Sequence, residues 1–179
     1  KSRLFDENPD YSIRRARFLD WNADGRTDIA FAIDDSLLLY LHTETGFATQ
    51  AQTIALGLGL TPDALAEVRG GDGRSFKGLS IKRLYEVKDL NNDTIADLIV
   101  RQEQFADAVE QSYSYRIHYG QTSEGRLQFK AEPDALINTK GIQSEPVFTD
   151  LNNDKRLDFF TPAAEFGIGT LVRALLAGT

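Results

Sequence analysis

The nine residues 150–158 read Asp150-Leu151-Asn152-Asn153-Asp154-Lys155-Arg156-Leu157-Asp158, with a carboxylate or amide oxygen at the first, third, fifth and ninth places. The same spacing occurs in Asp20-Trp21-Asn22-Ala23-Asp24-Gly25-Arg26-Thr27-Asp28 and in Asp89-Leu90-Asn91-Asn92-Asp93-Thr94-Ile95-Ala96-Asp97. With 17 Asp and 7 Asn among 179 residues, chance gives this pattern roughly 0.006 times in such a chain. Three copies therefore indicate an internal repeat, with starts 69 and 61 residues apart.

Oxygen donors at alternate places of a tight loop predict a site for a hard divalent cation. Calcium takes about 6 to 8 oxygens in irregular geometry, whereas magnesium demands a stricter octahedron. The four side chains and the backbone carbonyl of the seventh place would supply about five oxygens, and water would supply the rest. The chain has no Cys, and its two His lie outside the loops, so zinc and other metals with soft ligands are disfavoured.

The loops also admit two other interpretations. Asp and Asn also cap their own backbone in Asx turns, which need no metal. Carboxylates about 5 Å apart, however, repel by ~3 kcal/mol per pair at an effective dielectric near ~20, so a closed loop is expected to bind a cation. An EF-hand requires flanking helices and a Glu at the twelfth place. The twelfth residues here are Phe31, Val100 and Thr161, and the flanking sequences resemble strands.

Short apolar, β-leaning runs joined by turns surround each loop. In the first repeat they predict strands at 12–19, 29–33, 37–43 and 47–54. In the second they predict strands at 79–87, 98–101, 113–119 and 126–131, with 103–112 inserted at a hairpin tip. The third repeat offers 144–149, 159–161 and 170–176, without a fourth strand. Four short strands joined by tight turns are typical of one β-propeller blade.

Between the first two repeats, the sequence predicts a short helix at 61–68. Thr61 can cap it, Pro62 can occupy its first position, and Gly70-Gly71 can end it. The last turns of the first two repeats share the spelling Thr-x-x-Gly, at Thr43–Gly46 and Thr122–Gly125.

In the three loops and in the hairpins that turn at Gly46 and Gly125, the sequence resembles the FG-GAP/VCBS repeat family, which forms the calcium-binding blades of integrin-α-like β-propellers and of many bacterial surface proteins. The resemblance implies an all-β fold, a partial β-propeller of about three four-stranded antiparallel blades with a short helical insertion. The expected organisation is a single repeat domain over 1–179: blade 1 at 12–54, the insertion at 55–78, blade 2 at 79–131 and an incomplete blade 3 at 144–179.

Matched place by place, the resemblance implies up to three Ca2+ ions, each bracing the turn between the first two strands of a blade. The implied ligands are Asp20, Asn22, Asp24, Arg26 (carbonyl) and Asp28; Asp89, Asn91, Asp93, Ile95 (carbonyl) and Asp97; and Asp150, Asn152, Asp154, Arg156 (carbonyl) and Asp158. The chain turns sharply at the sixth place, where positive φ is expected. Gly25 suits that conformation, Lys155 tolerates it, and the β-branched Thr94 should be strained, so the second site is the weakest of the three predictions.

The net charge of −7 and the pI near 4.9 disfavour nucleic acid and anionic membranes as partners. No apolar run approaches the ~20 residues of a membrane span, so membrane insertion is not expected. Open calcium loops suit the high calcium concentration outside cells, which predicts an extracellular, cell-surface or periplasmic location. The chain has no Met, from which we expect a processed or excised product.

The first functional hypothesis is a calcium-stabilised scaffold or adhesion-like interaction module with a protein or glycan partner. Three blades leave open edges, so further blades from the parent chain or another protomer are expected. The alternatives are part of a propeller enzyme and a carbohydrate-binding protein. For an enzyme the sequence offers only His42, His118 and the pair Asp34-Asp35. Surface or strand-filling positions explain the histidines better, a turn explains the pair better, and no catalytic residue is assigned. For sugar binding Trp21 could stack on a ring, although its place in the loop favours packing over a neighbouring blade.

Overall fold

The computed structural model describes residues 16–22, 24–62, 78–105, 111–123, 126–140, 142–143, 146–160 and 163–164. These residues form strands and no helix, and all the strand pairs are antiparallel. The predicted all-β class is therefore confirmed. Nothing in the described part of the chain is a helix that could cross a membrane.

The first sheet has four strands in the order β1-β2-β3-β6. Their bounds are β1 (Ala16–Leu19), β2 (Asp28–Ile33), β3 (Ser36–Tyr40) and β6 (Gln52–Ala55). Because side chains alternate between the faces of a sheet, Ala30, Leu37 and Leu39 point to one face and are buried there.

The second sheet has the order β12-β9-β8-β7. Its strands are β7 (Ser80–Lys88), β8 (Asp97–Phe105), β9 (Gln111–His118) and β12 (Ala135–Lys140). The central strand β8 is buried on both faces, since Leu98 and Val100 belong to one apolar cluster and Ile99 to another. The predicted insertion at 103–112 is wrong in part, because 103–105 continue β8 and 111–112 begin β9. Residues 106–110 lie outside the described residues.

Along the chain, a small hairpin follows β3 of the first sheet and another follows β9 of the second sheet. The first hairpin consists of β4 (His42–Thr43) with β5 (Gly46–Phe47), and the second of β10 (Gln121–Ser123) with β11 (Arg126–Gln128). The fourth strand predicted at 47–54 is therefore wrong in part, since 47 belongs to the first hairpin while 52–54 lie in the observed fourth strand β6. The fourth strand predicted at 126–131 is wrong, since 126–128 belong to the second hairpin and the fourth strand is β12. Local turn chemistry explains the difference, because Thr43 Oγ1 donates to the carbonyl of Gly46 at 2.7 Å and closes the hairpin.

The third repeat is described only in part. Its loop joins β14 (Val147–Thr149) to β15 (Asp158–Phe160), which pair with each other, and β13 (Ile142–Gln143) pairs with β16 (Ala163–Ala164). The strand predicted at 170–176 lies outside the described residues. So does most of the helix predicted at 61–68, while Thr61 and Pro62 have no regular secondary structure.

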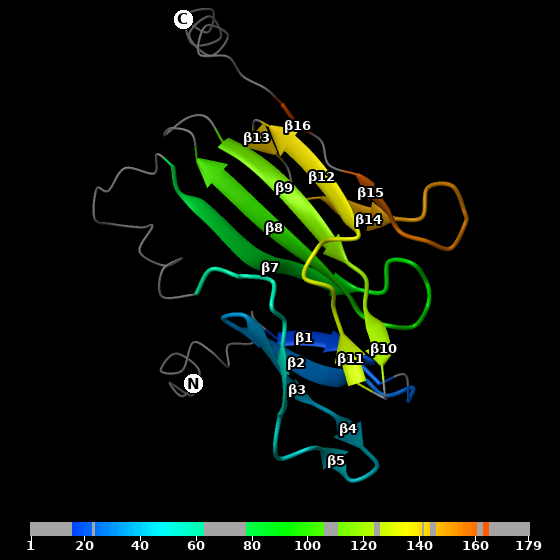
Figure 1. Ribbon diagram of the computed structural model, residues 1–179. Helices are drawn as coiled ribbons and strands as arrows, with labels where there is room; N and C mark the ends of the chain where they lie inside the picture. Colours follow the sequence, from blue (N-terminus) through cyan, green and yellow to red (C-terminus); the bar gives the residue numbers. More distant parts are fainter. Residues whose placement is uncertain are drawn as a thin grey trace, which may run out of the picture.

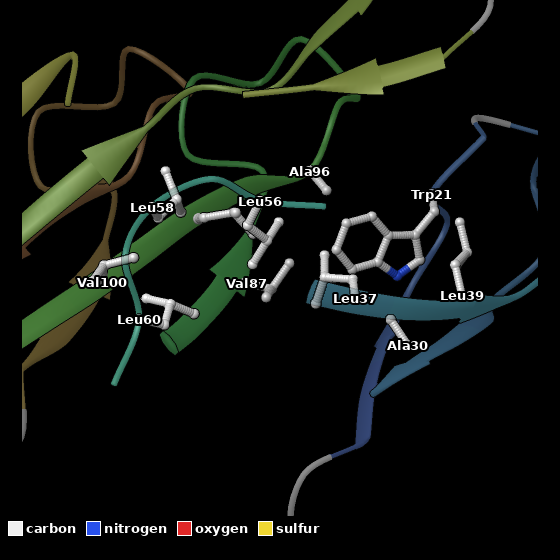
Figure 2. Packing of buried hydrophobic residues seen from close by; sticks show 11 residues of the cluster. Trp21, Ala30, Leu37, Leu39, Leu56, Leu58, Leu60, Val87, Ala96 and Val100 are labelled. Carbon is white, nitrogen blue, oxygen red and sulfur yellow. The ribbon is translucent and has the colours of Figure 1, made fainter. Parts of the chain in front are cut away.

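The second sheet lies between the first sheet and the β14–β15 hairpin (Figure 1). One apolar cluster joins the first two sheets, and Figure 2 shows Trp21 beside Leu37 in it. The other cluster joins Ile99 and Tyr115 of the second sheet to Phe159 of the hairpin. The three acidic loops therefore each belong to a successive layer of one stack.

The segment after β6 fills the space between the first two sheets. In Leu56-Gly57-Leu58-Gly59-Leu60 the three leucines are buried and both glycines have φ of 66°. Glycine is suited to this left-handed conformation, which any side chain would strain. The Asp35 carboxylate fixes the segment by accepting the N–H groups of Leu58 at 3.1 Å and Gly59 at 2.9 Å.

Candidate functional site

Each acidic loop is folded around the carboxylate at its first place. Asp20 accepts the backbone N–H of Asp24 at 3.1 Å and that of Gly25 at 2.7 Å, one on each oxygen. The other loops repeat both bonds, to Asp89 from Asp93 (3.2 Å) and Thr94 (2.9 Å) and to Asp150 from Asp154 (3.1 Å) and Lys155 (2.8 Å). The three loops thus share this pair of hydrogen bonds, although only four of their nine residue types are common to all.

The third and fifth places hold each other in the same way in every loop. In the first loop, Asn22 Oδ1 accepts the N–H of Asp24, and its Nδ2 donates to Asp24 Oδ2 at 3.1 Å. Asp24 Oδ1 then accepts the N–H of Arg26 at 2.9 Å. These are the contacts of an Asx turn, so the capping role weighed from sequence is present in the structure. These hydrogen bonds leave lone pairs that could bind a cation. A carboxylate oxygen has two lone pairs, and most of these oxygens accept only one hydrogen bond.

The ninth-place aspartate has a role that the sequence interpretation missed. Asp28 and Asp97 are fully buried. One oxygen of each accepts the N–H of the second place, from Trp21 at 2.9 Å and from Leu90 at 2.8 Å. The other oxygen accepts a backbone N–H from just beyond the end of β3 or β9: that of His42 at 2.7 Å for Asp28, and that of Gly120 at 2.9 Å for Asp97. This residue therefore ties its loop to the small hairpin of the same sheet.

Gly120 makes this contact close. A Cβ at that position would lie 2.2 Å from the carbonyl oxygen of Ala96, so no other residue fits without a backbone shift. In the third loop, Asp158 accepts the N–H of Leu151 at 2.9 Å and is half-buried.

The loops concentrate negative charge. Burial raises the pKa of Asp97 to about 6, and the charges of Asp93 and Asp89 add to that effect, while the N–H bonds from Gly120 and Leu90 oppose it. In the first loop, the backbone N–H of Arg26 lowers the pKa of Asp24, and the Arg26 guanidinium lies 3.2 Å from the same carboxylate. A cation near these groups would favour their charged forms.

The positive φ expected at the sixth place is confirmed. Gly25, Thr94 and Lys155 have φ of 84°, 67° and 68°. The fourth-place residues Asn92 and Asn153 are also left-handed, with φ of 61° and 63°. Asn tolerates this conformation better than most residues, whereas the β-branched Thr94 does not.

The apolar residues at the second and eighth places connect one layer to the next. Trp21 is only 6% exposed and belongs to the cluster that contains Ala96, the eighth-place residue of the second loop. Leu90 is 5% exposed and packs in the cluster with Leu157, the eighth-place residue of the third loop. Leu151, at the second place of the third loop, is 68% exposed. Because Trp21 is buried, it does not offer a ring for stacking on a sugar.

The predicted ligands of each set occupy one loop, and the donors are all oxygen, as calcium prefers. Among the described residues, however, no three His, Cys, Asp or Glu groups stand together closely enough to hold a metal ion. The carboxylates of the first and fifth places face backbone N–H groups instead. Ion binding would thus turn side chains toward a common point within a backbone that is already closed.

The residues weighed for catalysis lie in structural positions. His42 stacks on Phe47 with ring centroids 4.5 Å apart, and His118 is buried with Nδ1 2.9 Å from the carbonyl oxygen of Lys130. Asp34 and Asp35 form the turn between β2 and β3, as the alternative interpretation predicted.

Comparison of the chain with protein-family models, with curated proteins and with solved structures finds no match in any of the three. The geometry of the loops and the sheets is therefore the basis for assigning a function.

Proposed function

We propose that the chain is a calcium-stabilised repeat module of FG-GAP/VCBS type, an arc of propeller blades that serves as a scaffold or interaction domain of an exported protein. The observation that carries the proposal is the hydrogen-bond network that recurs in three loops, each joining two adjacent antiparallel strands of a successive layer. A single Asx turn needs no metal. The presence of Asp at the first, fifth and ninth places of all three loops supports a cation site in each.

The role of the ion in this proposal is structural. Calcium would neutralise the carboxylates of the first, fifth and ninth places and so offset their mutual repulsion. An ion that binds only the folded state stabilises it by mass action, by about 2.7 kcal/mol when its concentration is 100 times the Kd. Since the first and second loops also contact the layer that follows them, their ions would brace the packing between layers as well as one turn.

The same proposal includes a further layer beyond the third loop. Trp21 and Leu90 are each covered by the layer that follows them, whereas Leu151 in the equivalent place is exposed. We therefore assign Leu151 as the contact for another blade, from the parent chain or from another protomer.

Thermal unfolding in chelator, in millimolar calcium and in equal magnesium tests the proposed function. We expect the melting temperature to rise with calcium and to change much less with magnesium, because magnesium requires stricter geometry. Titration calorimetry should give up to three sites. A melting temperature that is the same in chelator and calcium would reject a structural role for the ion.

A further inference from the structure

A hollow of about 510 Å³ lies on the second sheet, away from the acidic loops. Its lining includes Gln102 and Gln104 of β8, Ser114 and Arg116 of β9, and Asn138 of β12. The second acidic loop enters β8 at Asp97, whereas Gln102 and Gln104 lie toward the other end of that strand. The hollow is thus separate from the proposed calcium site.

These five residues project from one face of the sheet. Gln102 pairs with Ser114, and Ser114 pairs with Asn138, so the three form a row across β8, β9 and β12. Arg116 is two residues from Ser114 on the same strand, and Gln104 is two residues from Gln102. Since residues two apart on a strand share a face, the row becomes a patch of amide, hydroxyl and guanidinium groups.

Arg116 is held in place by a chain of hydrogen bonds. Its Nε donates to Gln102 Oε1 at 3.1 Å, and Gln102 Nε2 donates to Ser80 Oγ at 2.8 Å. Gln102 is only 9% exposed, which limits its freedom to move. A guanidinium fixed through Nε keeps its terminal nitrogens as a planar fork for a ligand.

The charge around this fork is unbalanced. None of the residues that line the hollow in the described part of the chain carries a carboxylate, and within that part Arg116 forms no ion pair. By contrast, Arg101 on the opposite face pairs with Glu103 at 2.6 Å. In a protein with a net charge of −7, an arginine of this kind is suited to an anion brought by a ligand.

We propose that this hollow binds a sugar acid, in which a carboxylate is attached to a polyhydroxyl ring. The carboxylate would accept two parallel hydrogen bonds from the terminal nitrogens of Arg116. A planar carboxylate matches this fork better than a spherical anion does. The hydroxyl and amide groups of Ser114, Asn138 and Gln104 both donate and accept, as ring hydroxyls require. The volume accommodates a ligand of this size.

Titration calorimetry of the 179-residue chain with glucuronate tests the assignment, with glucose, acetate and inorganic phosphate as comparison ligands. We expect glucuronate to bind about tenfold or more tightly than each of the three, because only it uses both the fork and the neutral groups. Arg116→Lys keeps the charge and loses the fork, and it should weaken glucuronate binding by about tenfold or more. Asn138→Ala, on an exposed part of an edge strand, should weaken it several-fold.

Arg126→Gln is the matched control, since Arg126 is an exposed arginine of β11 outside the hollow, and it should bind glucuronate as the unaltered chain does. Circular dichroism establishes that each variant is folded. The assignment is overturned if the unaltered chain does not bind glucuronate, if acetate or phosphate binds equally tightly, or if folded Arg116→Lys and Asn138→Ala both retain full affinity. The same measurements in chelator and in calcium keep this result separate from the proposed calcium sites.

Discussion

Leu157 donates its backbone N–H to the carbonyl of Leu90 at 2.8 Å and so ties the third acidic loop to the second. The two residues also share an apolar cluster with Phe148 and Phe159. A loop whose charged side chains suit a cation thus contributes its apolar residues to the contact between layers. The free energy of ion binding and that of layer packing are therefore expected to be coupled.

This relationship predicts unequal effects of the same substitution at equivalent places. Leu90→Ala removes a buried side chain and should lower the free energy of unfolding by about 2–4 kcal/mol. Leu151→Ala removes an exposed one and should change it by about 0.5 kcal/mol or less. Urea unfolding of both variants is the measurement, and each is the control for the other. Equal losses would show that Leu151 is covered in this chain.

Neutral variants at the fifth place should reduce the effect of calcium one loop at a time. Asp93→Asn and Asp154→Asn keep an oxygen for the backbone N–H of the seventh place but remove a charge. A tenfold loss of affinity at one site removes about 1.4 kcal/mol of calcium-dependent stability. We expect a smaller rise in melting temperature with calcium. In chelator we expect a change of about 1 kcal/mol or less, because the bond from Asn91 or Asn152 Nδ2 to the fifth place is lost while carboxylate repulsion is relieved. Glu132→Gln, an exposed residue outside the loops, is the control. If the rise is undiminished in both variants, calcium acts elsewhere.

Relief of strain at the sixth place should stabilise the second loop. Thr94→Gly allows φ of 67° without a β-branched side chain and should raise the free energy of unfolding by about 1 kcal/mol. Lys155→Gly, at φ of 68°, should give less because lysine is not β-branched. Gly25→Ala should cost about 1 kcal/mol, since φ there is 84°. Thermal unfolding in chelator measures all three, and a destabilised Thr94→Gly would contradict the assignment of strain.

The lowered pKa of His118 predicts that the protein loses stability in mild acid. Burial lowers its pKa below the ordinary value of 6.5, while the Lys130 carbonyl opposes that shift. The unfolded chain therefore takes up a proton more readily than the folded chain. The stabilising contribution is complete above pH 6.5 and is lost as the pH falls through the folded-state pKa.

The test compares melting temperature against pH for the unaltered chain and for His118→Gln, both in chelator. The loss between neutral pH and pH 5 should be smaller in the variant. Asp97, whose raised pKa acts in the opposite direction, is present in both proteins, so it does not affect the difference. Identical profiles would mean that His118 does not contribute to the acid response.

The sequence by itself determined the repeat, the all-β class and the left-handed sixth place. These features are local: alternating oxygens, period-two apolar runs and a sharp turn each depend on residues within a few places of one another. The position of Trp21 over the next layer was also expected from the sequence, because burial of a large apolar side chain against another element is favourable. The segment 126–131 was misassigned because a strand and a short hairpin have the same local composition.

Only the tertiary structure decided what depends on distant partners. Asp28 and Asp97 bind the N–H groups of His42 and Gly120, which lie 14 and 23 residues away, and no local pattern encodes those bonds. The same is true of the Arg116–Gln102 pair, which meets only because β8 and β9 are in register. Trp21, Leu90 and Leu151 occupy equivalent places, and only the tertiary structure shows that the first two are buried and the third is exposed. The physical reason is that chain geometry limits near neighbours, whereas the register and stacking of sheets determine which distant groups meet.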